Sequence, residues 1–272
     1  MNKIIKKIIE KTQYQGNNEP NTKQISASQF GDELLQIWLR YKYGVIPNEK
    51  FTQSTIGSLV HIGIQELIKN EPEIEIEKDV LVKFPNGWSL SGSIDIVDNK
   101  EKVLYDIKVT KQYTISQLKK EPKHHYIWQL SVYRYLMKEL TGSDYDIRLF
   151  AVLKDGSDFN IKDGHATPHY EIIDLEPISY KEIEKRFNEL VEQLESYEQV
   201  GSYPEQCKDL WIRKLKNGNT IKMKCEVYCS YKDVCPYNKD QRRDKIKFWK
   251  EKQNEEKRNL YTKKRTIRNN NK

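Results

Sequence analysis

The stretch between residues 90 and 111, LSGSIDIVDNKEKVLYDIKVTK, constrains the fold more than any other part of the chain. Apolar side chains occupy every second position on both sides of a short polar segment, which is the pattern of two half-buried strands joined by a turn. A turn centred on Asn99-Lys100 pairs Asp95 with Leu104. The stretch therefore predicts a β-hairpin in this register.

Charged side chains mark one face of this hairpin. In the expected register Asp95, Asp106 and Lys108 project together from the side opposite the isoleucines, because side chains two apart share a face. The two carboxylates become diagonal neighbours with Cβ atoms about 7–8 Å apart or less, close enough to hold one divalent cation. A solvated antiparallel sheet also shows alternating charges on its outer face, so the hairpin alone is compatible with both interpretations.

The remaining patterns alternate between helices and strands. Helices are expected at 26–44, with Ser28 as N-cap, and at 51–70, 123–140 and 176–199. Further strands are expected at 73–84, 146–154 and 169–175. This order predicts an α/β fold with a central mixed β-sheet flanked by helices.

Composition and charge indicate a soluble intracellular protein with a basic end. The 272 residues are 32% charged, and no apolar run is long enough to cross a membrane. The amino-terminal stretch MNKIIKKIIEKTQYQG is basic and amphipathic but lacks the features of a secretory signal. We expect a cytoplasmic protein with no membrane partner. Its richness in Lys, Asn and Ile suggests an AT-rich bacterial or phage genome, and so a bacterial or phage-infected host cell.

Positive charge is concentrated after residue 237. Residues 238–272 carry 14 lysines and arginines against 5 acidic residues, whereas the whole chain has 47 against 40. Such a tail is typical of a nucleic-acid contact. It is equally compatible with a solvated helix end.

His61 lies among apolar residues of the second expected helix. The flanking small residues Gly57, Ser58 and Gly63 predict that this helix approaches another backbone closely. An unpaired imidazole in such surroundings is costly. A metal ion is one partner that satisfies it, and a hydrogen bond within the core is the other.

Gln129 and Tyr133 are spaced i, i+4 on the helix that follows the hairpin, so their side chains share one helix face. An amide beside a phenol suits hydrogen bonding to a phosphate or a base. The same pair is also compatible with boundary residues that cap a core.

All four cysteines lie in the last quarter of the chain: Cys207, Cys225, Cys229 and Cys235. In a reducing compartment this clustering indicates a metal or redox centre rather than disulfides. Four thiolates suit a [4Fe–4S] cluster or a structural Zn²⁺. The tight C-x3-C-x5-C trio is compatible with either centre, and chance clustering of buried thiols is the third alternative.

Four short motifs follow one another along the chain: G-x-x-x-H (Gly57, His61), G-x-x-D (Gly92, Asp95), D-x-K (Asp106, Lys108) and Q-x-x-x-Y (Gln129, Tyr133). In this order they resemble the RecB-like branch of the PD-(D/E)XK nucleases. That branch includes CRISPR-associated and AddB-type exonucleases whose carboxy-terminal cysteines hold an iron–sulfur cluster. The resemblance covers roughly residues 26–237 and implies a restriction-endonuclease-like core.

The resemblance implies roles for these residues. It implies four ligands for catalytic Mg²⁺ or Mn²⁺: the side chains of His61, Asp95 and Asp106 and the backbone carbonyl of Ile107. Lys108 would orient or deprotonate the attacking water and stabilise charge on the phosphate. Gln129 and Tyr133 would position the substrate strand.

The cysteines depart from the family pattern. Related nucleases take one cluster ligand from the amino-terminal region, where SASQFGDELL has no cysteine. The fourth ligand expected here is therefore Cys207, and the centre remains a [4Fe–4S] cluster or, alternatively, a structural Zn²⁺.

These observations predict four segments: an amino-terminal extension (1–25), a nuclease core (26–202), a cysteine-rich segment (203–237) and a basic helix with a disordered tail (238–272). The expected function is a Mg²⁺- or Mn²⁺-dependent DNA nuclease, an exonuclease acting on ends or single strands. Recombination, repair or phage DNA processing would supply its DNA, with recombination or replication proteins as partners. The alternatives are a non-catalytic nucleic-acid-binding module on the same fold and a zinc-stabilised interaction protein.

Overall fold

The computed structural model describes residues 19–46, 53–121, 124–157, 168–215, 218 and 220–238. The chain divides into two compact units, Met1–Pro204 and Glu205–Lys272. Most of the expected amino-terminal extension and nearly all of the basic tail lie outside the described residues.

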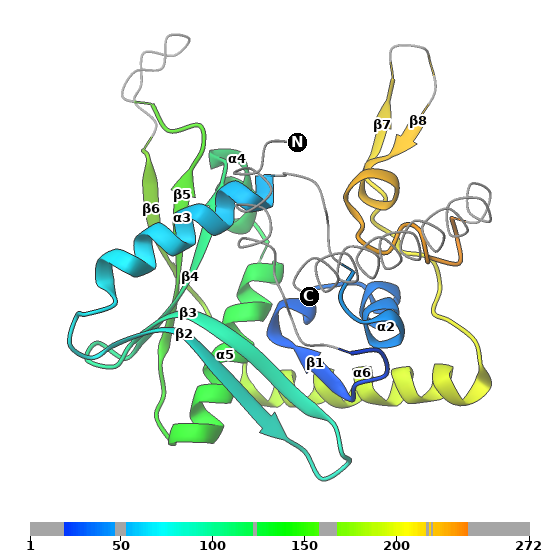
Figure 1. The fold of residues 1–272 in the computed structure, drawn as a ribbon, viewed down its shortest axis with the longest axis horizontal. Helices are drawn as coiled ribbons and strands as arrows, with labels where there is room; N and C mark the ends of the chain where they lie inside the picture. The colour runs from blue at the N-terminus through cyan, green and yellow to red at the C-terminus, as the bar shows by residue number, and fades with distance from the viewer. Residues whose placement is uncertain are drawn as a thin grey trace, which may run out of the picture. The chain divides into compact units, whose positions relative to one another are not determined.

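The first unit contains a six-stranded sheet (Figure 1). Its strands run in the order β1-β3-β4-β5-β6, and β2 pairs with β3. The pairs β1–β3 and β4–β5 are parallel, and the other pairs are antiparallel. The prediction of a central mixed sheet is confirmed. The bounds are β1 (Gln24–Ser26), β2 (Ile74–Lys83), β3 (Ser89–Asp98), β4 (Val103–Thr110), β5 (Asp146–Leu153) and β6 (Tyr170–Leu175).

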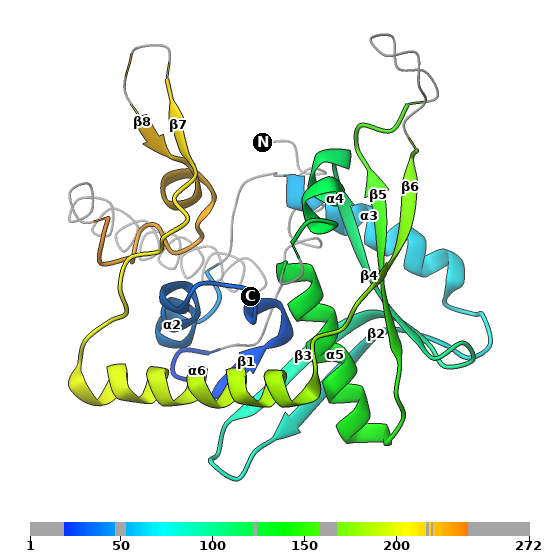
Figure 2. The same cartoon turned by 180° about the vertical axis from the view of Figure 1, so that it is seen from behind.

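Helices flank this sheet. They are η1 (Ala27–Gln29), α2 (Leu34–Tyr43), α3 (Gln53–Ile68), α4 (Gln112–Leu118), α5 (His125–Thr141) and α6 (Tyr180–Val200). Helix α3 contacts β3 and β4; it crosses in front of the strands in Figure 1 and behind them in Figure 2. Helix α5 contacts β2 to β5 and also α6. None of the helices within the described ranges combines the length and hydropathy needed to cross a bilayer.

The single helix expected at 26–44 is wrong, and so is Ser28 as its N-cap. The Gln29 side chain folds back and accepts hydrogen bonds from the Ser26 amide at 2.8 Å and the Ser26 hydroxyl at 3.0 Å. This local side-chain bonding closes a 3₁₀ turn, η1. The α-helix begins only after Glu33, which occupies its N-cap position.

The register expected for the hairpin is also wrong. The observed pairs are Ile96 with Tyr105 and Asp98 with Val103, two residues away from the expected pairing. The Asp98 carboxylate accepts hydrogen bonds from the amides of Lys100 at 3.0 Å and Glu101 at 2.9 Å. Lys102 adopts a φ of +55°, and the connection is a four-residue loop. Because the shift is two residues, each side chain stays on its expected face.

The face of β4 expected to be solvated is buried. Leu104 and Asp106 share that face, and both are almost inaccessible to solvent, while Ile107 on the other face is equally buried. Both faces of the strand are therefore covered by protein. A carboxylate in such a position is stable only with charged or hydrogen-bonding partners.

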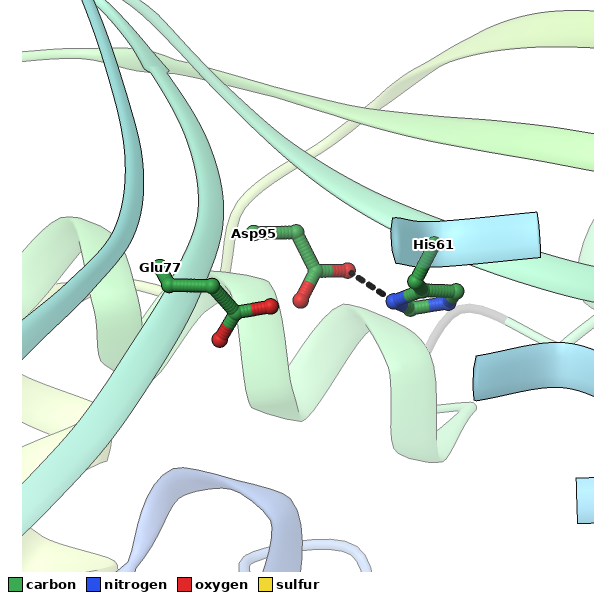
Figure 3. A group of neighbouring side chains, drawn as sticks. All are labelled: His61, Glu77 and Asp95. Atoms are coloured by element: carbon green, nitrogen blue, oxygen red, sulfur yellow. Dashed lines mark ion pairs between the residues drawn. The ribbon is translucent and has the colours of Figure 1, made fainter. Parts of the chain in front are cut away.

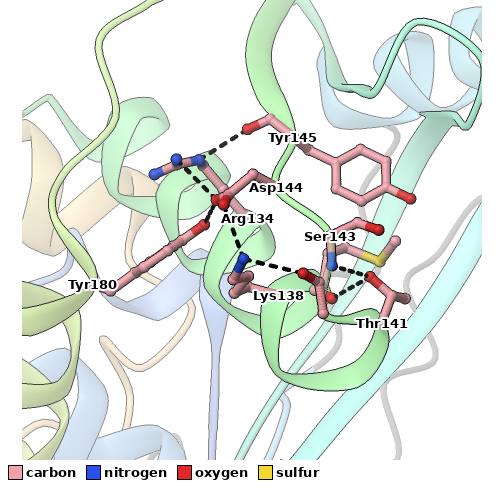
Figure 4. Close-up of polar contacts among 9 residues, drawn as sticks. Arg134, Lys138, Thr141, Ser143, Asp144, Tyr145 and Tyr180 are labelled. Carbon is pink, nitrogen blue, oxygen red and sulfur yellow. Dashed lines mark hydrogen bonds and ion pairs between the residues drawn. The ribbon is translucent and has the colours of Figure 1, made fainter.

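Asp144 fixes the carboxy-terminal end of α5 (Figure 4). Its carboxylate accepts hydrogen bonds from Arg134 at 3.1 Å and Lys138 at 2.9 Å, both on α5, and from the Tyr180 hydroxyl at the start of α6. Gly142, at the C-cap of α5, takes the left-handed conformation that ends helices. These contacts hold α5, which carries two of the expected site residues, against α6.

The second unit has a small two-stranded sheet of its own. Strands β7 (Ile212–Lys214) and β8 (Thr220–Lys222) pair antiparallel, and a π-helical turn, η2 (Met223–Tyr228), follows. The turn contains Cys225 and ends at Cys229. Five of the six residues in the two strands are exposed, and Ile221 is half-buried.

Candidate active site

The site forms where β3 and β4 separate. Their pairing stops at Ile96 and Tyr105, so the positions that would pair next are Asp95 and Asp106. Instead of a ladder bond, the Ile107 amide donates a 2.6 Å hydrogen bond to Asp95 Oδ2. The opening between the strands therefore brings both carboxylates of the sequence motifs to one place.

Three side chains from three elements meet at this opening (Figure 3). His61 of α3, Glu77 of β2 and Asp95 of β3 place one potential ligand atom each within 4.8 Å of one another. His61 Nδ1 lies 3.6 Å from Asp95 Oδ2. The expected proximity of His61 and Asp95 is thus observed, and Glu77 joins them.

Glu77 was missed from the sequence. It lies opposite Asp95, because the neighbouring pairs are Ile76 with Ile96 and Lys78 with Ile94. Its φ of +46° places it in the left-handed region inside a strand, which is strained backbone of the kind found at functional sites. The available signal was the acidic alternation EIEIEKD, but it identifies no single glutamate before the pairing of β2 with β3 is known.

Hydrogen bonds hold Glu77 in place. Gln65 Nε2 donates to its Oε1 at 2.5 Å, and the Ser93 hydroxyl donates to its Oε2 at 3.2 Å. Gln65 is buried and lies four residues after His61 on α3, so the same helix face supplies both groups.

Asp106 lies beside the three-residue group but binds different partners. Lys108 Nζ donates to its Oδ1 at 2.9 Å and lies 2.8 Å from its Oδ2, and Gln129 Nε2 also donates to Oδ1 at 3.0 Å. Oδ2 is buried and accepts no hydrogen bond of good geometry from the described residues. It therefore interacts with the Lys108 ammonium only as an ion pair. A cation near Oδ2 would satisfy it.

The crowded charges alter the acid–base properties of the site. Burial, together with the Asp106 carboxylate, raises the pKa of Asp95 to about 8. Burial and the nearby Lys108 ammonium lower the pKa of His61. Burial opposes the charge of Lys108, but the two aspartates outweigh it and raise the pKa of this lysine. Burial and the neighbouring Asp106 carboxylate therefore disfavour the ionised form of Asp95, and a bound divalent cation would favour it.

A pocket of about 310 Å³ opens beside His61 and Lys108. Its lining residues are Gly57, Ser58, His61, Ile107, Lys108, Val109 and Lys154. The expectation that Gly57 and Gly63 allow close backbone packing is wrong, because a Cβ at either position would meet no atom within 4 Å. Gly57 instead lines the pocket, where a Cβ would meet open space.

Gln129 and Tyr133 connect two of the motifs. The Gln129 amide donates to Asp106 and, at 2.8 Å, to the Tyr133 hydroxyl. Tyr133 is buried, and its ring packs so closely on Gly92 that a Cβ there would lie 2.3 Å from Tyr133 Cε1. The glycine of G-x-x-D and the tyrosine of Q-x-x-x-Y are therefore packing partners.

The four cysteines lie in the second unit, each half-buried: Cys207, Cys225, Cys229 and Cys235. The Cys229 amide donates to Lys224 O and the Cys235 amide to Tyr231 O, both at 2.8 Å, so the trio lies on successive turns. The Lys224 amide donates to Leu210 O at 3.3 Å, which brings the Cys207 segment alongside. Within the described residues, the sulfurs do not form a group of three atoms within 4.8 Å.

The sequence matches the family model of the PD-(D/E)XK nuclease superfamily over residues 70–236, more than half of the chain. No protein of curated function matches it. Among solved structures, the crystal structure of SSO0001 is similar, with a TM-score of 0.52 and 14% identity, covering 86% of this chain and 94% of that chain.

Two further structures are similar at lower scores. The alkaline exonuclease LHK-Exo from Laribacter hongkongensis gives a TM-score of 0.40 at 16% identity, covering 66% of this chain and 92% of that chain. Its complex with dAMP gives 0.43 at 17% identity with the same coverage. The likeness to SSO0001 extends to the fold, and the family match includes β2 to β6 and the cysteine segment. This chain belongs to the PD-(D/E)XK nuclease superfamily.

Proposed function

We propose that this protein is a divalent-metal-dependent deoxyribonuclease that hydrolyses phosphodiester bonds at DNA ends or in single strands. The observation that carries the proposal is the grouping of His61, Glu77 and Asp95 beside the Asp106–Lys108 pair. All of these residues except His61 lie within the stretch that matches the PD-(D/E)XK nuclease family. The four motif residues expected to take part in the chemistry are all present: His61, Asp95, Asp106 and Lys108. A non-catalytic module on a degenerate nuclease fold would be expected to have lost at least one of them.

The donor set fits Mg²⁺ or Mn²⁺. Hard cations take carboxylate and carbonyl oxygens, and Asp95 and Glu77 supply carboxylates within reach of one another. Asp106, whose Oδ2 lies 2.8 Å from Lys108 Nζ, and the carbonyl of Ile107, a residue that lines the pocket, would complete an oxygen-rich set, and His61 would add one nitrogen. A divalent cation held there supplies Lewis-acid activation of the phosphate.

Lys108 acts in this proposal as a fixed positive charge. Its ammonium contacts both Asp106 oxygens and lies 5.4 Å from the centre of the Tyr126 ring. Held between these groups it faces the negative charge that develops on phosphoryl oxygens during hydrolysis. Direct pairing with a carboxylate favours this electrostatic role over deprotonation of water by the lysine.

Gln129 acts as a positioning residue. Its amide joins Asp106 to the buried Tyr133, so it orients the carboxylate rather than the substrate strand. The side chain of Tyr133 is covered, and its hydroxyl is engaged by Gln129, which supports a structural role for this tyrosine.

The cysteine centre is proposed as a [4Fe–4S] cluster bound by Cys207, Cys225, Cys229 and Cys235, a ligand set that differs from the RecB-like pattern in having no amino-terminal cysteine. The turns that carry the trio and the backbone contact from Leu210 to Lys224 support a shared centre in the second unit. Bound metal would contribute folding free energy to a segment whose small hairpin is mostly exposed. Zinc is the alternative, and metal analysis of anaerobically purified protein distinguishes them.

Cleavage of end-labelled DNA with Mg²⁺, Mn²⁺ or EDTA tests the function. We expect digestion of linear single strands with either metal, none with EDTA, and resistance of circular single strands if the enzyme acts at ends. Asp95→Asn and Asp106→Asn should each abolish cleavage and weaken Mn²⁺ binding in calorimetric titrations. Asp79→Asn is the matched control, because Asp79 is an exposed aspartate on β2.

A further variant tests whether the metal is held by Glu77, in the cluster with His61 and Asp95, or by Asp106. Glu77→Gln should weaken Mn²⁺ binding if Glu77 is a ligand, and leave it unchanged if Asp106 alone completes the set. Thermal denaturation of each variant verifies that the fold is retained. Cleavage at the wild-type rate by folded Asp106→Asn would refute the proposed active site.

A further inference from the structure

The second unit exposes an aromatic pair that its own packing does not explain. Trp211 precedes β7, and Tyr228 ends η2. Their rings are stacked, with centroids 5.4 Å apart and an interplanar angle of 5°. Trp211 is 58% exposed and Tyr228 60% exposed. Large aromatic side chains left in solvent together indicate a binding surface rather than a core.

The backbone holds Trp211 in this position at some conformational expense. Its φ is +43°, a region that bulky residues rarely adopt. The Trp211 carbonyl accepts a 3.0 Å hydrogen bond from the Met223 amide, which closes the base of the hairpin and maintains the strained residue. Strain of this kind persists where the surrounding structure imposes it, often at ligand-binding positions.

Positive charge surrounds the pair. Residues 210–224 contain five lysines and arginines and no acidic residue. Arg213, Lys214 and Lys222 are exposed and form no ion pair within the described residues, and Lys222 pairs across the sheet with the residue after Trp211. The nearest carboxylates are engaged, because Asp209 binds Lys224 and Glu226 accepts from the Lys222 amide.

We propose that Trp211 and Tyr228, with Arg213, Lys214 and Lys222, form a platform for single-stranded nucleic acid. Unpaired bases would stack on the exposed ring faces while the basic side chains neutralise the backbone phosphates, a combination that binds single strands with little sequence preference. A duplex hides its base faces and would contact only the charges. The platform rests on the proposed nuclease function, for which it would supply a second contact on the substrate strand.

Fluorescence anisotropy of labelled oligo(dT) without added Mg²⁺ or Mn²⁺ tests the platform in the full-length protein. Cleavage needs either metal, and the absence of a chelator leaves the cysteine centre intact. Trp211→Ala and Tyr228→Ala should each raise Kd about tenfold, whereas Trp211→Phe, which keeps a flat ring, should remain close to wild type. Tyr170→Ala is the matched control, because Tyr170 is 64% exposed on β6 of the first unit. Oligo(dA) should respond as oligo(dT) does.

The basic residues have their own readout. Replacing Arg213 and Lys214 together by alanine should reduce the slope of log Kd against log salt by about 1.4 for single strands. Lys185→Ala, a lysine with a 74% exposed side chain on α6, controls for a general loss of charge. A blunt duplex should lose affinity in the double variant but not in Trp211→Ala.

The outcomes separate the platform from the nuclease proposal. An unchanged Kd for folded Trp211→Ala and Tyr228→Ala, or no binding of oligo(dT) by the wild type, overturns the platform, even if the protein cleaves DNA. Weakened binding by these variants supports the platform, even if no cleavage is found with Mg²⁺ or Mn²⁺. If both proposals hold, Trp211→Ala should raise KM for single strands and leave kcat unchanged.

Discussion

Replacing Gly92 by alanine should destabilise the protein and disturb the active site at once. An ideal Cβ at this position would lie 2.3 Å from Tyr133 Cε1, 2.9 Å from Cδ1 and 3.4 Å from Ala27 Cβ. Carbon atoms in favourable contact are about 3.5–4.0 Å apart, so the buried tyrosine ring would have to move by about 1 Å or more. Overpacking of this kind costs about 1–3 kcal/mol.

The displacement should also reach the Asp106 carboxylate of the proposed active site. Tyr133 accepts a hydrogen bond from Gln129, and the same amide donates to Asp106. Misplacement of a reacting group by about 1 Å reduces rates on the order of 100-fold. We therefore expect Gly92→Ala to lower the free energy of unfolding in urea by about 1–3 kcal/mol. We also expect kcat for DNA cleavage to fall on the order of 100-fold at a temperature where the variant is still folded.

A double-mutant cycle checks the cause. Tyr133→Ala opens the space that the new methyl group needs, so Gly92→Ala in that background should cost little, with a coupling energy of about 1 kcal/mol or more. Gly63→Ala is the control, because a Cβ on this exposed glycine of α3 meets no atom, and it should stabilise the helix by about 0.5–1 kcal/mol. Equal losses from Gly92→Ala with and without Tyr133 would refute the steric explanation.

Three further predictions address other parts of the fold. His124 Nδ1 accepts from the Tyr126 amide at the N-cap of α5, and burial lowers the pKa of His124 below its ordinary 6.5. Its contribution to stability is fully present above pH 6.5 and is lost as the pH falls through the lower folded value, so His124→Asn, which keeps a cap, should flatten the fall of Tm between about pH 7 and 5. Glu195→Ala should reduce the free energy of unfolding by about 1–3 kcal/mol, because it removes the 2.8 Å acceptor of the fully buried Trp88 indole N–H; a Glu195→Gln variant that is as unstable would argue against the lost acceptor. Cys229→Ser should release iron or zinc and lower thermal stability, and a metal-free wild type with the same Tm as this variant would dismiss the cysteine centre.

Local patterns predicted the elements of this fold well where burial is simple. The alternation in residues 94–109 led correctly to two antiparallel strands, and the helical spacing after residue 124 led to α5. The helix prediction failed at Ser26 and Gln29, where side-chain hydrogen bonds to the backbone close a 3₁₀ turn. The hairpin register failed because the turn spans residues 99–102 and not Asn99-Lys100 alone. Both failures arise from hydrogen bonds that composition and periodicity do not report.

The same division holds for the candidate site. Asp95, Asp106, Lys108 and His61 were identifiable because the motifs that contain them resemble those of a nuclease family, whereas residue type and spacing alone left a structural role open. The structure brings the four residues close together. Glu77 was not identifiable, because its partner Asp95 is on another strand and only the β2–β3 register selects it from its acidic neighbours.

By itself, the sequence determined which side chains could bind a cation, which segments form strands and helices, and where positive charge is concentrated. Those properties depend on residue type and near-neighbour spacing, which are local. Tertiary structure alone decided that Asp106 is buried, that Gln129 orients it from α5, and that Gly92 is small because Tyr133 packs against it. These are contacts between residues far apart in the chain, and their free energies depend on packing and dielectric surroundings that exist only once the strands and helices have assembled.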